Sequence, residues 1–134
     1  MIKRQVFTAT LLVITLGLAS CSSNTSPIQA TQTAGALSVS LTVDPDPPVP
    51  MQDALLELKL FDSKGQPISG ASVSLDLTMP GMQMPMNRPE VVESSIGVYQ
   101  AKTLFTMAGK WRIQVLVTHD GKSETFIFDL NTRE

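Results

Sequence analysis

The sequence has few of the side chains that most often carry catalysis. Its 134 residues include one cysteine and one histidine, so it can form no intramolecular disulfide and lacks the Cys and His pairs of a zinc site. It has no Gly-x-Ser-x-Gly elbow and no phosphate-binding glycine loop. The single histidine, His119, precedes an Asp-Gly pair, where an exposed turn residue is expected. We therefore expect that the protein is not an enzyme.

Long hydrophobic runs are also scarce, and the one present lies near the N-terminus. Lys3 and Arg4 precede an apolar run over residues 6–18, whose length is typical of a secretory signal peptide. A membrane-spanning helix needs about 20 such residues. The run ends in LASC (residues 18–21), which resembles the lipobox of bacterial lipoproteins. That resemblance implies cleavage before Cys21 and attachment of acyl chains such as palmitate to it; a free thiol in an uncleaved anchor is the alternative.

The chain divides into three predicted parts. We expect a signal peptide over residues 1–20, a lipidated Cys21 with a flexible tether over residues 21–36, and one folded domain over residues 37–134. The tether is polar and uncharged, a composition typical of flexible linkers. Because acyl chains hold a protein on a membrane, we expect this one in the bacterial cell envelope, facing the periplasm or the cell exterior.

Basic residues are in the minority once the signal peptide is removed. Eight Lys and Arg then stand against twelve Asp and Glu, a formal charge of −4. This balance argues against a nucleic-acid partner and leaves no basic patch for anionic lipid.

No long stretch has helical periodicity, and short alternating segments fill the rest of the chain. They cover residues 37–43, 54–62, 71–79, 91–92, 97–105, 110–118 and 123–130. Turn signals separate them, the clearest being the Asp-Gly pair at residues 120–121. The absence of βαβ alternation makes a parallel sheet unexpected. We predict an immunoglobulin-like antiparallel β-sandwich of about seven strands, with Trp111 as a buried packing anchor.

Methionine is the residue that stands out, because four of the seven fall within residues 79–86. Prolines and a glycine interrupt this segment, and neutral thioethers favour Cu(I) over harder cations. The alternation of the preceding strand places Met79 at its inward end, so Met79 fits the core better than a ligand set. Met82, Met84 and Met86 recur at period two, and an extended backbone would present them on one side. The candidate Cu(I) ligands are therefore Met82, Met84 and Met86, with Met79 behind them.

Three motifs follow one another in the folded part: TMPGM (residues 78–82), GVY (97–99) and MAGKW (107–111). In this order they resemble the YtkA-like domain family, relatives of the FixH proteins, over most of the folded part. The resemblance implies an exported, non-enzymatic, immunoglobulin-like domain linked with copper handling or cytochrome oxidase assembly. Many relatives carry a histidine within or soon after the methionine loop, where this chain has Gln83, Asn87 and Arg88. Two possibilities then remain: a Cu(I) site made of thioethers alone, or a loop that has lost its metal.

Three interpretations of the methionine segment stay open. It is a copper-binding or copper-delivery loop, or an adaptable apolar contact surface for a membrane or envelope protein, or a structural loop folded back onto the sheets. The positions of the sulfur atoms separate them. A preformed site brings the sulfurs together, a contact surface splays them into solvent, and a structural loop buries them.

Overall fold

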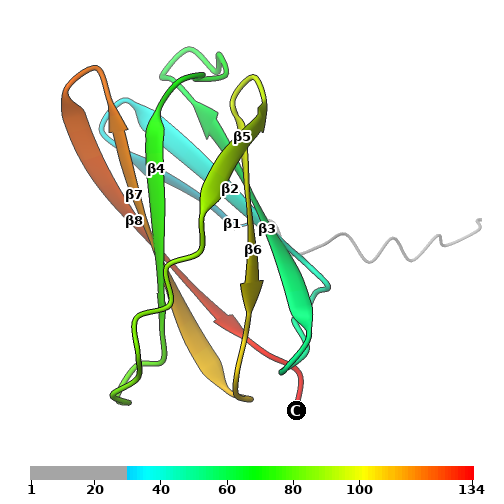
Figure 1. Cartoon of the computed structure of the whole chain (residues 1–134). Coiled ribbons are helices and arrows are strands. Elements are labelled where there is room, and N and C mark those ends of the chain that lie inside the picture. Colours follow the sequence, from blue (N-terminus) through cyan, green and yellow to red (C-terminus); the bar gives the residue numbers. More distant parts are fainter. Residues whose placement is uncertain (1–29) are drawn as a thin grey trace, which may run out of the picture.

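The computed structural model describes residues 30–134, which form eight strands and no helix (Figure 1). The strands are β1 (Ala30–Ala34), β2 (Leu37–Asp44), β3 (Asp53–Phe61), β4 (Ser72–Thr78), β5 (Val91–Ser95), β6 (Val98–Leu104), β7 (Lys110–His119) and β8 (Lys122–Asn131). The predicted signal peptide and Cys21 lie outside the described residues. Within residues 30–134, no helix has the length and apolar character needed to cross a membrane.

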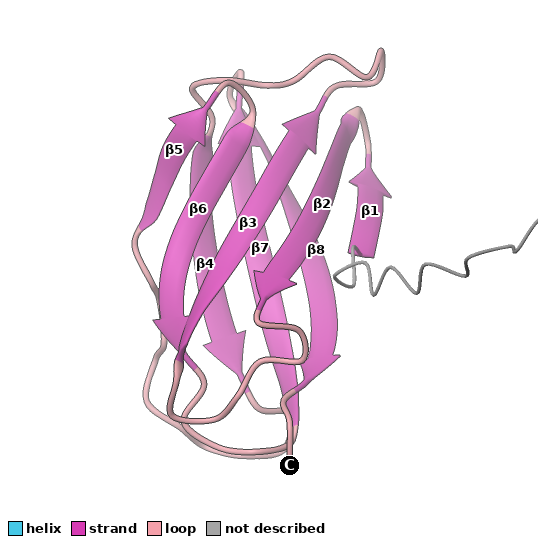
Figure 2. Ribbon diagram, turned by 90° about the vertical axis from the view of Figure 1, so that its right-hand side faces the viewer, coloured by secondary structure: helices cyan, strands magenta, loops and turns pink. Residues whose placement is uncertain are grey.

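The strands form two antiparallel sheets that pack face to face (Figure 2). One sheet has the order β1-β2-β3-β6-β5 and the other has the order β4-β7-β8. If β2 to β8 are lettered A to G, the sheets read ABED and CFG, the arrangement of constant-type immunoglobulin domains. The predicted fold class is confirmed, and β1 is an additional strand at the edge of the larger sheet.

Alternate residues of the strands meet in one core, as the sequence pattern predicts. The inward faces of β2, β3 and β7 are buried throughout: Leu37, Val39, Leu41, Val43, Leu56, Leu58, Leu60, Trp111, Ile113, Val115 and Val117. Trp111 is fully buried and meets Phe105 edge to face, with 5.3 Å between ring centroids. The predicted role of Trp111 as a packing anchor is confirmed. The predicted hairpin is also present, since Asp120 and Gly121 both have positive φ and link β7 directly to β8.

The first strand lies where the sequence predicted a tether. β1 pairs with β2 from Ala30 opposite Leu41 to Ala34 opposite Leu37. The side-chain amide of Gln32 reaches the other sheet, where it accepts the N–H of Ile127 at 3.1 Å and donates to the carbonyl oxygen of the same residue. A polar segment can form this strand because β2 supplies its backbone hydrogen bonds and Gln32 satisfies part of the free edge of β8. The tether therefore does not extend to residue 36, because residues 30–34 belong to the domain.

Candidate functional site at the methionine end

Three loops meet at one end of the sandwich, the lower end in Figure 1. They are the β2–β3 loop (residues 45–52), the β4–β5 loop (79–90) and the β6–β7 turn (105–109). The backbone N–H of Met51 donates to the carbonyl of Phe105 at 2.8 Å, which joins the first loop to the third. We call the surface of these three loops the methionine end. It contains every methionine of residues 30–134: Met51, Met79, Met82, Met84, Met86 and Met107.

The methionine segment leaves β4 through a tight turn. The N–H of Met82 donates to the carbonyl of Met79 at 3.1 Å, with Pro80 and Gly81 at the two central positions. Gly81 has a φ of 80°, and a type II turn requires such a positive φ at this position. The base of the loop is closed where the N–H of Leu77 donates to the carbonyl of Asn87 at 2.9 Å. The loop therefore begins and ends on a fixed backbone.

Two of the four clustered methionines point inward. Met79 is 8% exposed and belongs to the core. Its terminal methyl packs so closely on Gly109 that a Cβ there would lie 3.1 Å away. Met84 is half-buried against the core, and its sulfur accepts the backbone N–H of Met79 at 3.2 Å. These two side chains attach the loop to the sandwich.

The other two clustered methionines are exposed. Met82 is 51% exposed and Met86 is 74% exposed, so the period-two methionines do not share one environment. The Pro80–Gly81 turn separates Met79 from these three residues, and the hydrogen bond from the N–H of Met79 holds the sulfur of Met84 inward. A purely structural loop accounts for Met79 and Met84 but not for Met82 and Met86. The exposure of these two side chains is what a contact surface predicts, so a copper site here is not preformed and requires the sulfurs to converge when the ion binds.

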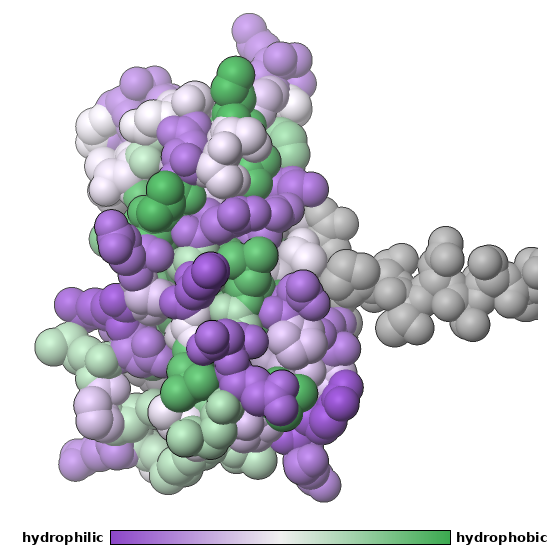
Figure 3. Space-filling model, turned by 45° about the vertical axis from the view of Figure 1, so that its right-hand side comes forward, coloured by the Kyte–Doolittle hydropathy of each residue, from purple (hydrophilic) through white to green (hydrophobic). Residues whose placement is uncertain are grey.

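Two further exposed methionines stand on the neighbouring loops. Met51 is 67% exposed in the β2–β3 loop and Met107 is 41% exposed in the β6–β7 turn. Figure 3 shows pale-green, moderately hydrophobic side chains gathered at this lower end of the molecule. The sequence interpretation missed both residues because they are isolated in the chain. The order of the predicted strands could have found them. In a run of antiparallel strands, every second loop lies at the same end of the domain, and Met51 and Met107 are on such loops.

A hollow links the methionine loop to the β6–β7 turn. It has a volume of about 540 Å³ and is lined by Met84 and Met86 on one side and by Leu104 and Thr106 on the other. The turn itself is held by the indole N–H of Trp111, which donates to the carbonyl of Met107 at 3.0 Å. Two loops that are distant in sequence thus form one continuous surface.

The side chains exposed at the methionine end offer thioether sulfurs as donor atoms. Thioethers are neutral and polarisable, and they suit Cu(I). Among residues 30–134, no group of three or more His, Cys, Asp or Glu side chains is placed to hold a metal ion, as the ligand preferences of zinc and calcium would require. His119 lies in the β7–β8 hairpin at the opposite end, 3.3 Å from the carboxylate of Asp120. The chain's histidine is therefore remote from the methionine end.

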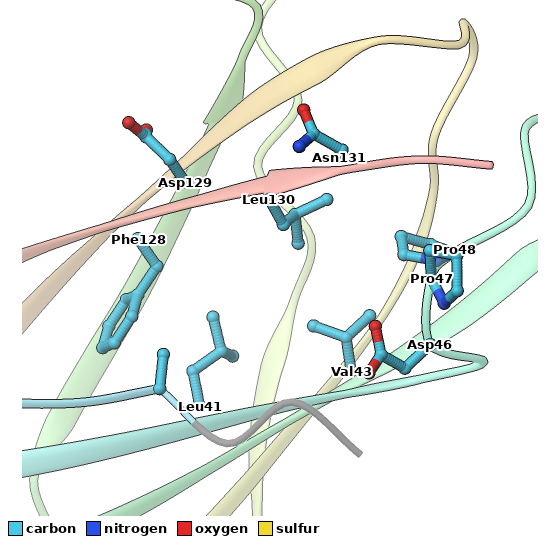
Figure 4. A pocket seen from close by; sticks show the side chains of 10 residues that line it. Leu41, Val43, Asp46, Pro47, Pro48, Phe128, Asp129, Leu130 and Asn131 are labelled. Carbon is cyan, nitrogen blue, oxygen red and sulfur yellow. The ribbon is translucent and has the colours of Figure 1, made fainter. Parts of the chain in front are cut away.

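A second concave feature contains no sulfur. A groove of about 470 Å³ opens between β2 and β8, where Leu41 and Val43 face Phe128 and Leu130 (Figure 4). Asp129 points away from these apolar side chains. Its carboxylate accepts two hydrogen bonds from Arg112, at 2.9 and 3.1 Å, and lies 3.4 Å from the ammonium of Lys110. The pKa of the Asp129 carboxyl is lowered to about 2, and the hydrogen bonds from Arg112 are the largest cause.

The architecture is that of a small immunoglobulin-like module with an exposed thioether surface at one end. Residues 31–116 match the family model described as YtkA-like, and the chain belongs to that family. The match begins within β1, which agrees with a domain that starts before residue 37.

The fold also has a relative among solved structures. A DUF4426 family protein from Pseudomonas aeruginosa, known from a crystal structure, superposes with a TM-score of 0.60 at 18% sequence identity. The similarity covers 77% of this chain and 93% of that one. At this identity it concerns the fold alone. None of the curated proteins matches the sequence.

Proposed function

We propose that the protein is a lipid-anchored, non-enzymatic module of the bacterial envelope that binds or delivers Cu(I) through its methionine loop. Its context would be copper homeostasis or oxidase assembly, as the resemblance to the YtkA-like family implies. The observation that carries the proposal is that the methionines of the loop fall into two groups, one packed inward and one exposed. Met79 and Met84 pack inward and fix it, whereas Met82 and Met86 present their thioethers to solvent.

This arrangement suits capture and transfer of a soft ion. Thioethers need no deprotonation, so the exposed sulfurs are ready to bind across the physiological pH range. The turn through Pro80 and Gly81 and the bridge from Leu77 to Asn87 restrict the loop before it binds, which lowers the entropy cost of ordering. Because Met82 and Met86 are exposed, a partner's ligands can reach the ion and exchange with them.

A titration with Cu(I) against a competing chelator tests the proposal. The test compares residues 22–134 with a variant in which Met82, Met84 and Met86 are all replaced by Leu. Leucine keeps the apolar side chains and removes the sulfurs. We expect the Cu(I) affinity to fall at least about tenfold, or 1.4 kcal/mol. Equal affinities for the two proteins would contradict the proposal, provided that their urea midpoints agree.

A second candidate is a metal-free interaction module for a membrane or envelope protein. It is favoured by the same exposed methionines, since flexible thioethers form adaptable apolar contacts. Under this interpretation the triple Leu variant keeps its function, because shape and hydrophobicity are preserved. A complementation assay separates the two: loss of function in the Leu variant supports copper, and retained function supports the contact surface.

The anchor is tested independently of the metal. We expect radiolabelled palmitate to be incorporated into the full-length protein and the protein to fractionate with membranes. The Cys21→Ala variant should incorporate none and leave the membrane fraction. Unchanged labelling in that variant would rule out Cys21 as the acylated residue.

A further inference from the structure

Met107 occupies a turn whose backbone is held from two sides. Its carbonyl accepts the indole N–H of Trp111 at 3.0 Å and the hydroxyl of Thr132 at 3.4 Å. The N–H of Gly109 donates to the same hydroxyl at 2.9 Å. Trp111 is fully buried and Thr132 is 5% exposed. The backbone of Met107 is therefore fixed by the core, while its side chain remains 41% exposed.

The turn that carries Met107 lies beside the methionine loop on both of its flanks. On one flank, Gly109 lies against the terminal methyl of Met79. On the other, Thr106 lines the same hollow as Met86. The strand register explains this proximity, because Thr78 at the end of β4 lies opposite Arg112 near the start of β7. Met107 is thus a methionine outside the loop whose turn the fold brings to the loop's edge.

Met84 is poorly placed to act as a ligand. Its sulfur already accepts the N–H of Met79, and its side chain is half-buried against the core. Turning this sulfur toward solvent would leave a part-buried N–H without its partner, which costs free energy. Met82, Met86 and Met107 carry no such cost, because their side chains are exposed.

We propose that Met107 supplies the third thioether of the Cu(I) site, together with Met82 and Met86, and that Met84 is a positioning residue rather than a ligand. This inference rests on the proposed function. The site then spans two loops instead of one, and the rigid β6–β7 turn provides its fixed ligand. Methionine side chains rotate about three bonds, so the two loop residues can adjust to that fixed point.

Methyl NMR tests the ligand set directly. In residues 22–134 labelled with ¹³C at the methionine methyls, Met→Leu variants assign the signals before titration with Cu(I) under anaerobic conditions. We expect the methyls of Met82, Met86 and Met107 to shift and to saturate together, and those of Met51 and Met79 to stay in place. A Met107 signal that does not move while Met84 shifts would overturn the inference.

Competition titrations give a second readout with a matched control. We expect Met107→Leu to weaken Cu(I) binding at least about tenfold, as Met82→Leu does, and Met84→Leu to weaken it less than either, because it loosens the loop without removing a ligand. Met51→Leu is the control, since Met51 is also exposed at the methionine end but lies on the β2–β3 loop and is not one of the proposed ligands. Binding by the native protein with no effect of Met107→Leu would refute this inference alone. No Cu(I) binding by the native protein would refute the proposed function and this inference with it.

Discussion

Replacing Met79 by Ala should destabilise the domain, because Met79 is a core residue and not a free ligand. Its side chain is 8% exposed and packs against Gly109. Met→Ala changes in cores cost about 2–5 kcal/mol. We expect about 2–3 kcal/mol here, since the side chain lies at the end of a strand beside a loop that can relax into the cavity. At roughly 4–8 °C per kcal/mol for a domain of this size, the melting temperature should fall by about 10–20 °C.

The matched control is Met82→Ala in the same loop. Met82 is 51% exposed, so its truncation should change the free energy of unfolding by less than about 0.5 kcal/mol. Urea denaturation followed by tryptophan fluorescence measures both variants, because Trp111 is the chain's one tryptophan and is fully buried. A Met79→Ala variant within about 0.5 kcal/mol of the native protein, or a Met82→Ala variant as unstable as Met79→Ala, would refute the assignment of these two side chains.

Two further predictions concern the β8 side of the sandwich. The pKa of Asp129 in the folded protein is about 2, below its ordinary 3.8, and the largest cause is the hydrogen bonding from Arg112. The ionised carboxylate therefore stabilises the fold above about pH 4. This stabilisation is lost as the pH falls toward 2. In the Asp129→Asn variant, the free energy of unfolding should depend less on pH between about pH 4 and pH 2. An unchanged pH dependence would contradict the lowered pKa of Asp129. Gln32→Leu removes both hydrogen bonds to Ile127 and should cost about 1–2 kcal/mol in urea denaturation. An unchanged free energy of unfolding would mean that Gln32 of β1 does not help to hold the two sheets together.

The strands could be predicted because their side chains alternate between core and solvent. That pattern is local, and it located β2 to β8 and the inward position of Met79. β1 carries no such pattern, since its residues are small or polar and its partners are Leu37–Leu41 and Ile127. β1 forms because it pairs with β2 and bonds to Ile127 of β8, and the composition of residues 30–34 alone does not indicate these contacts.

The candidate site was only half predictable for a similar reason. Period two placed Met82, Met84 and Met86 on one side of an extended segment, but the sulfur of Met84 is held inward by the N–H of Met79 while Met82 and Met86 are exposed. Met107 is alone in the sequence, and its position at the loop's edge follows from the β4–β7 register. Long-range pairing, rather than local spacing, decides which sulfurs can meet.

Copper K-edge X-ray absorption of the Cu(I)-loaded protein is the direct test of a methionine site, because it identifies the atoms bound to the metal. We expect three sulfur atoms bound to the copper, with no nitrogen or oxygen neighbour, and one fewer sulfur in the Met107→Leu variant. Copper bound mainly by nitrogen or oxygen, or a protein that retains no copper after desalting, would contradict the proposed methionine site.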